Sequence, residues 1–272
     1  MIKKTLLTLG LSTLMAMSLS ANDSLMMATT TSTEDTGLLD YLAPQFEKDT
    51  GTTLKWVATG TGKALKMGEN CDVDILLVHA PSAEKKFVDE GFGVNRNEVM
   101  FNDFVIIGPV SDPAGISGKS TDDAFKEIKE KKANFLSRGD NSGTHKKELG
   151  MWEKVSKIVP EKDSWYIQTG QGMIATINMA SEKSGYTLTD RGTWIKYESQ
   201  KGDKNNMKIV VENDNSLFNQ YSVITVNKDK CPNVKTKLAS DFSNWIVKDE
   251  TQKLIGDFKL LNKPLFTPNA KK

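Results

Sequence analysis

The stretch Val73-Asp74-Ile75-Leu76-Leu77-Val78 is an almost unbroken apolar run. A run of this kind is typical of a strand at the centre of a parallel sheet, because helices then cover both of its faces. Apolar runs alternate with amphipathic stretches along the chain on either side of it. The alternation predicts an α/β fold, in which the apolar runs form strands and the amphipathic segments form helices.

Shorter apolar runs mark the other predicted strands. They are Met26 to Ala28, Leu54 to Val57, Phe104 to Ile107, Ala133 to Leu136, Met207 to Val211 and Tyr221 to Val226. Between the first two runs, apolar residues at helical spacing predict a helix that ends at Gly51. The same pattern predicts a helical tail over residues 235–261.

The first twenty residues have the features of an export signal. Lys3 and Lys4 precede an apolar run from Leu6 to Met17, and the small residues of Ser18-Leu19-Ser20 follow it. We therefore expect residues 1–20 to be a cleaved signal peptide and the mature protein to be periplasmic. The first cysteine is Cys71, so no lipid anchor on an N-terminal cysteine is expected.

The charge balance and the cysteine count exclude several classes of protein. The chain has 36 basic and 35 acidic residues, and the export segment contains two of the basic ones. The mature chain then has no basic field for nucleic acid. No Cys/His cluster has metal-ligand spacing, so neither a metal nor another cofactor is predicted. Cys71 and Cys231 are either a disulfide or two separate buried thiols.

Two polar segments, near residues 108–112 and 212–218, read as places where the chain crosses between two bodies. They predict one lobe from both ends of the chain, residues 21–108 with 217–272. A second lobe, residues 109–216, would be inserted into it.

Three segments rich in hydroxyl groups or glycine each follow a predicted strand and precede a predicted helix. They are Thr29 to Thr33, Thr59 to Gly62 and Ser142 to Thr144. The first N–H groups of a helix have no internal partner, and the helix dipole adds partial positive charge there. Such starts suit anion binding, although Ser and Thr are also ordinary helix caps. The three together indicate an anion site.

Arg138 supplies a full positive charge beside the third of these segments. A guanidinium stays ionised and presents a planar fork to two oxygens of an oxyanion. Asp140 is placed to hold that fork. The alternative is an ordinary surface ion pair.

Several motifs resemble the periplasmic tungstate-binding proteins of ABC importers. They are TTTS (Thr29 to Ser32), TGTG (Thr59 to Gly62), SRGDNSGTH (Ser137 to His145) and TGQGM (Thr169 to Met173). The resemblance implies a two-lobed periplasmic binding fold of type II. Each lobe would be a mixed sheet flanked by helices, and two crossover strands would join the lobes. It also implies a monomer that holds one tetrahedral oxyanion in the cleft and delivers it to permease subunits.

By the same resemblance, the ligand contacts are Thr31, Ser32, Thr61, Arg138, Ser142, Gly143 and Thr144. His79 is a further candidate, because phosphate-binding relatives have an aspartate there that accepts the proton of phosphate. Tungstate has no proton at neutral pH, and an imidazole can donate to it. A histidine satisfied at a strand end without touching ligand is an equal alternative.

Other functions fit less well. A secreted serine hydrolase would use Ser142 with Asp140 and with either His145 or His79. Ser142 and His145 are only three residues apart, whereas a working triad is built from distant segments, and two histidines leave little material for a general base. We therefore expect no enzymatic activity. Molybdate, sulfate or phosphate in place of tungstate, and a sensor subunit in place of a transport protein, remain open from the sequence.

Overall fold

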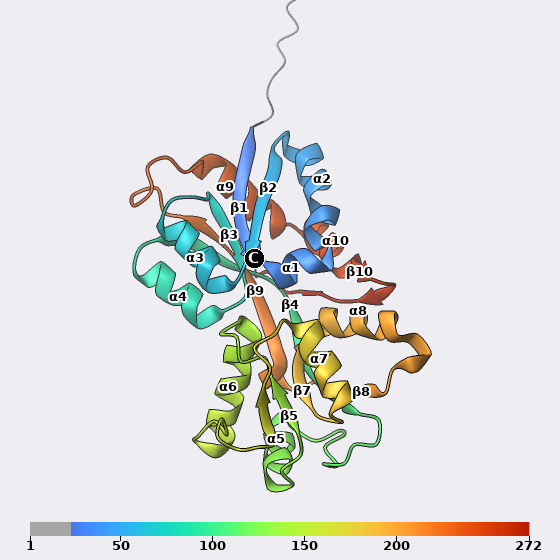
Figure 1. Ribbon diagram of the computed structural model, residues 1–272. Coiled ribbons are helices and arrows are strands. Elements are labelled where there is room, and N and C mark those ends of the chain that lie inside the picture. The colour runs from blue at the N-terminus through green and yellow to red at the C-terminus, as the bar shows by residue number, and fades with distance from the viewer. Residues whose placement is uncertain (1–22, 272) are drawn as a thin grey trace, which may run out of the picture.

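The computed structural model describes residues 23–271. The predicted signal peptide, residues 1–20, lies outside them. Within the described part the chain forms two lobes, one above the other in Figure 1. The predicted two-lobed α/β fold is confirmed.

The upper lobe is built on a mixed sheet. β1 pairs in parallel with β2 and β3, whereas β9 is antiparallel to β3 and to β4. In sheet order the strands are β12 (Thr267–Pro268), β4 (Gly93–Pro109), β9 (Phe218–Val226), β3 (Ile75–Val78), β1 (Ser24–Thr30) and β2 (Thr53–Thr59). All four residues of β3 are buried, as the apolar run around it predicts.

β4 continues into the lower lobe, where it pairs with different strands. Its C-terminal half is antiparallel to β7 (Thr187–Asp190) and β8 (Met207–Val211). In the same lobe, β5 (Phe135–Ser137) and β6 (Tyr166–Gln168) form a separate parallel pair. One strand of 17 residues therefore takes part in the sheets of both lobes.

Ten α-helices cover these sheets in the described part of the chain. They are α1 (Thr31–Thr36), α2 (Leu38–Thr50), α3 (Thr61–Glu69), α4 (Pro81–Asp89), α5 (Thr121–Glu130), α6 (Gly143–Ser156), α7 (Met173–Glu182), α8 (Arg191–Lys201), α9 (Thr236–Ile246) and α10 (Asp249–Asp257). The predicted apolar face of α2 is buried, and Gly51 ends it with φ +74°. The predicted helical tail consists of two helices, α9 and α10, and a short strand pair follows them from Lys259.

A disulfide closes the upper lobe. Cys71 follows α3 and Cys231 follows β9, and their sulfurs are bonded with the Cα atoms 5.3 Å apart. This settles the alternative that the sequence leaves open. The bond joins the N-terminal and C-terminal parts of the chain across 160 residues.

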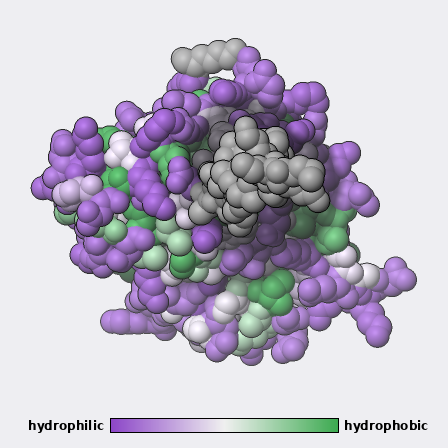
Figure 2. All heavy atoms as spheres, turned by 90° about the horizontal axis from the view of Figure 1, so that it is seen from above, coloured by the Kyte–Doolittle hydropathy of each residue, from purple (hydrophilic) through white to green (hydrophobic). Residues whose placement is uncertain are grey.

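On the face that Figure 2 shows, hydrophilic residues surround small, separate apolar patches. Over the described residues, no helix has the length and apolar character needed to cross a membrane.

A buried carboxyl group joins three elements of the lower lobe. Glu148 on α6 accepts hydrogen bonds from Ser137 Oγ on β5 (2.5 Å) and from Tyr166 OH on β6 (2.8 Å). Burial raises the pKa of Glu148 to about 7, although both hydroxyl donors act to lower it. The residue fixes the end of β5 from which the loop to α6 departs.

Removing the disulfide with Cys71→Ser and Cys231→Ser together is expected to lower the free energy of unfolding by about 2–5 kcal/mol, because the bridge restricts the unfolded chain. Guanidinium unfolding measures the change. The unsubstituted protein in reductant should match the double variant, and equal midpoints with and without the bridge would contradict the expectation.

Glu148→Gln is expected to stabilise the protein at pH 8 by about 3 kcal/mol and to change little at pH 4. The folded pKa of Glu148, about 7, lies above that of an unfolded glutamate. As the pH rises, the unfolded chain therefore loses this proton first, and the stability of the parent protein falls between about pH 4 and 7. Unfolding curves at several pH values give the comparison. A constant difference across the range would show that Glu148 is ionised in the fold.

Candidate oxyanion-binding site

A cavity of about 350 Å³ lies where the loops of both lobes meet. The upper lobe contributes the starts of α1 and α3 and the end of β3. The lower lobe contributes the β5–α6 loop and the starts of α7 and α8. The lining residues are Thr30, Thr31, Ser32, Asp35, Thr59, Gly60, Thr61, His79, Arg138, Ser142, Gly143, Thr144, Gly172, Met173, Ile174, Ala175, Asp190 and Thr193.

The structure brings all the predicted site residues to this one cavity. They are Thr31, Ser32, Thr61, His79, Arg138, Ser142, Gly143 and Thr144. Three come from the first two hydroxyl-rich segments, and the others come from chain positions 79 and 138–144. The segments are distant in sequence and meet because each follows the end of a strand. Their contact with a ligand stays a prediction.

At the first two helix starts the backbone N–H groups are only partly capped. Thr30 caps α1 by accepting from Thr33 N at 3.3 Å, and α1 ends after six residues at Gly37. Gly60 precedes α3 and offers no side chain as a cap. The first N–H groups of α3 are therefore available to the cavity, next to the hydroxyl of Thr61.

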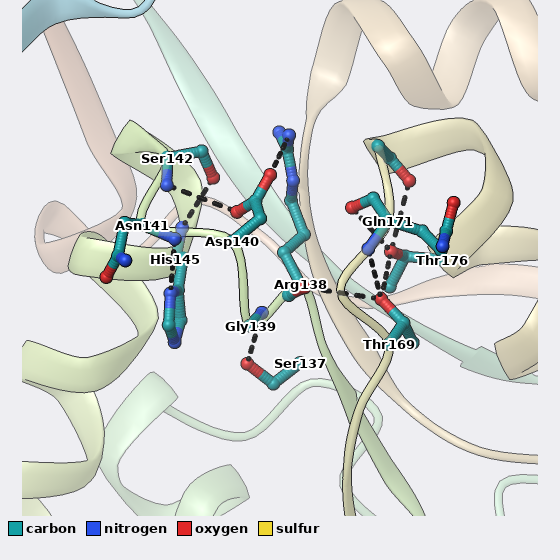
Figure 3. A network of polar contacts seen from close by, with 11 residues as sticks. Ser137, Arg138, Gly139, Asp140, Asn141, Ser142, His145, Thr169, Gln171 and Thr176 are labelled. Atoms are coloured by element: carbon teal, nitrogen blue, oxygen red, sulfur yellow. Dashed lines mark hydrogen bonds and ion pairs between the residues drawn. The ribbon is translucent and has the colours of Figure 1, made fainter.

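Arg138 is held in place by its loop (Figure 3). Its guanidinium donates to Asp140 Oδ2 at 2.5 Å, while Asp140 Oδ1 accepts from Ser142 N at 3.1 Å. Partial burial acts to raise the pKa of Asp140, but the bonds from Ser142 and Arg138 outweigh it and lower that pKa. Nε of Arg138 is buried and has no partner in the described part of the chain. The predicted role of Asp140 as the group that orients Arg138 is confirmed.

The start of α6 depends on a neutral histidine. Ser142 caps the helix by accepting from His145 N at 3.3 Å. His145 Nδ1 accepts from Asn141 N at 3.0 Å. Asn141 has a positive φ of +58°. Burial lowers the pKa of His145, so the ring is neutral with its proton on Nε2.

His79 has partners in the protein on both ring nitrogens. Nδ1 lies 2.9 Å from Asn219 Oδ1, and Nε2 lies 3.1 Å from Thr30 Oγ1 and from Ser32 Oγ. Burial lowers the pKa of His79, so this imidazole is also neutral. His79 therefore has hydrogen-bond partners within the protein, as the alternative of a satisfied histidine at a strand end predicts. Its ring also lines the cavity.

Sequence reasoning assigned no ligand role to two parts of the cavity wall. α7 begins at the cavity after Gly172, which provides no side-chain cap, and the preceding Gly170 has φ +62°. Gly170 and Gly172, which precede an apolar helix, were the sequence signal from which this part of the wall could have been found. Asp190, the cap of α8, is the other, and both of its oxygens are occupied by Thr193 N (2.8 Å) and Thr193 Oγ1 (2.6 Å).

The arrangement does not form a hydrolase triad. The bond between Ser142 and His145 uses the backbone N–H of the histidine, and the ring accepts from Asn141. Over residues 23–271 no group of three acidic, histidine or cysteine residues has the geometry to hold a metal ion.

Comparison with known proteins places the chain among binding proteins. The family model described as a PBP superfamily domain matches residues 18–250. The tungstate-binding protein TupA of Campylobacter jejuni is 54% identical over 240 residues, which is 88% of this chain and 89% of that protein. TupA of Peptoclostridium acidaminophilum is 48% identical over 257 residues, 93% of this chain and 88% of the relative.

A solved structure is also similar to this chain. The tungstate-binding protein TupA from Desulfovibrio alaskensis G20 is 63% identical, with a TM-score of 0.88, and the match covers 92% of this chain and all of that one (100%). These relatives are named as binding proteins, in line with the prediction that the chain is not an enzyme. The chain belongs to the PBP superfamily and, within it, to the family of the TupA proteins.

Proposed function

We propose that this chain is the substrate-binding component of an ABC importer, which captures tungstate in the cavity between its lobes. The relatives named as tungstate-binding proteins support this substrate. The observation that carries the proposal is the cavity itself, where five helix starts and one guanidinium face the same space. Helix starts and an arginine favour a small anion with several oxygens.

In this proposal the predicted residues contact the oxygens of the anion. Thr31, Ser32 and Thr61 donate from the upper lobe, and Arg138 with the start of α6 donates from the lower lobe. The exposed carboxylate of Asp35 lines the same cavity and would favour a protonated anion such as phosphate. Asp190 lines it too, but each of its oxygens already accepts one hydrogen bond from Thr193.

We also propose the lobe boundaries predicted from sequence, residues 21–108 with 217–272 and residues 109–216. The distribution of buried side chains supports them in outline, since the apolar clusters around β1 and β3 and those around β5 and β7 draw mostly on different parts of the chain. The exceptions are Ile195 of α8, which packs in an upper cluster, and residues 104–107 and Leu217, which pack in the lower clusters. A ligand that touches both lobes would stabilise the closed form by its higher affinity for it.

The remaining parts of the proposal concern partners and place. We propose a periplasmic monomer that delivers its anion to permease subunits, by analogy with the family. A sensor subunit is the competing role, and uptake of tungstate by cells with and without the gene would separate the two.

Isothermal titration is expected to show one tungstate bound per chain at submicromolar or tighter affinity, and much weaker phosphate binding. The reason is a wall that consists mainly of donors, which match an anion without a proton. Molybdate and sulfate, titrated in parallel, rank the other candidates. Equal or tighter binding of phosphate would contradict the assignment, and Asp35→Asn would then show whether that carboxylate is the acceptor.

Arg138→Ala is expected to weaken tungstate binding about 10- to 150-fold, against roughly fivefold for removal of one hydroxyl, because charged hydrogen bonds contribute ~1.5–3 kcal/mol and neutral ones ~1. Arg138→Lys should recover only part of the loss, since a point charge lacks the fork. Lys154→Ala, which removes a positive charge at the opposite end of α6, is the matched control. Unchanged binding in Arg138→Ala would make Arg138 structural.

A further inference from the structure

A chain of buried hydrogen bonds runs from the cavity wall to the two strands that cross between the lobes. His79 Nδ1 lies 2.9 Å from Asn219 Oδ1, and the Asn219 amide nitrogen donates to Asn102 Oδ1 at 2.8 Å. Asn102 on β4 and Asn219 on β9 are directly paired in the sheet, and both side chains are about 95% buried. The contact between His79 and Asn219 joins residues that are 140 positions apart in the sequence.

Asn102 determines which way the amide of Asn219 faces. An amide has one acceptor end and one donor end, so donation to Asn102 leaves the Asn219 oxygen toward His79. The imidazole must then hold its proton on Nδ1, and Nε2 becomes an acceptor. The ring also packs on Tyr221, with centroids 4.7 Å apart, which fixes its plane.

An acceptor at Nε2 organises the hydroxyl groups at the start of α1. Thr30 Oγ1 accepts from Thr33 N and lies 2.7 Å from Thr33 Oγ1. The hydroxyl protons can therefore run in one direction, from Thr33 to Thr30 and from Thr30 to Nε2, which lies 3.1 Å away. Ser32 Oγ lies 3.1 Å from Nε2 and from Thr30 Oγ1, and both of these acceptors are then already used, so the Ser32 O–H can donate into the cavity.

We propose that His79 and Asn219 are positioning residues: Asn219 makes His79 an acceptor, and His79 takes the hydroxyl proton of Thr30, which leaves the hydroxyl of Ser32 to donate to a bound oxyanion. This rests on the proposed function as far as the oxyanion is concerned. It differs from the role considered from sequence, in which the imidazole donates to the anion directly. The tautomer of His79 in the free protein follows from the hydrogen bonds alone.

The tautomer can be measured because the chain has only two histidines, His79 and His145. Long-range proton–nitrogen NMR spectra of protein with ¹⁵N-labelled histidine distinguish Nδ1–H from Nε2–H rings, and a His145→Gln variant assigns the signals. We expect His79 with its proton on Nδ1 and His145 with its proton on Nε2. A proton on Nε2 of His79 would overturn the proposal without any substitution near the site.

Asn219→Leu then tests the consequence. We expect the proton of His79 to move to Nε2 and tungstate affinity to fall about tenfold, the loss of one well-oriented hydrogen bond. Asn97→Leu is the control, since Asn97 lies on β4 but bonds to Asn95 O and Ser243 Oγ. It should change neither measurement.

Two results in Asn219→Leu would refute the positioning role: weaker binding with the tautomer unchanged, or a changed tautomer with binding intact. Failure of the unsubstituted protein to bind tungstate would instead refute the proposed function, because the spectra are recorded without ligand.

Discussion

The cavity depends on one constraint: parallel strands end at the same edge of a sheet, and the helices that follow them begin there. β1, β2 and β3 obey it in the upper lobe, so the start of α1, the start of α3 and His79 reach one place. β5 and β6 repeat it below, where the loop to α6 and the start of α7 follow. Helix starts with free N–H groups therefore face each other across the gap, which is where an anion gains most from them.

The second requirement is that the helix starts of the upper lobe and those of the lower lobe keep their positions relative to one another. β4 and β9 cross between the lobes as an antiparallel pair, and each face of this pair carries a polar anchor. On one face Asn102 and Asn219 connect to His79. On the other, Arg191 at the start of α8 is bound to Asp103 at 2.5 Å and to Glu212 at 2.8 Å. Arg191 thus acts on the crossing region and does not line the cavity.

Local signals in the sequence were enough for the fold and for most of the cavity wall. A hydroxyl or glycine between an apolar run and an amphipathic one marks a helix start wherever the strands lie, so Ser32, Thr61 and Ser142 could be found. What the sequence could not supply were contacts between distant segments. The partner of His79 is 140 residues away, and the pairing of Cys71 with Cys231 spans 160. The start of α7 lies in the TGQGM motif, but its glycines have no side chain to donate to a ligand, and no ligand role was assigned to it.

The charges around the cavity explain how it can favour a dianion with one arginine. Asp140 and Asp190 lie beside it with carboxylates that already accept backbone and side-chain hydrogen bonds, whereas the exposed carboxylate of Asp35 opposes a bound anion. Burial lowers the pKa values of His79 and His145, so neither adds a positive charge near neutral pH. The attraction must then come from Arg138 and from backbone dipoles that hold fixed positions. Backbone N–H dipoles distinguish anions by the positions of the anion's oxygens. They also distinguish anions by protonation, because an N–H group cannot accept a hydrogen bond from the proton of a protonated anion.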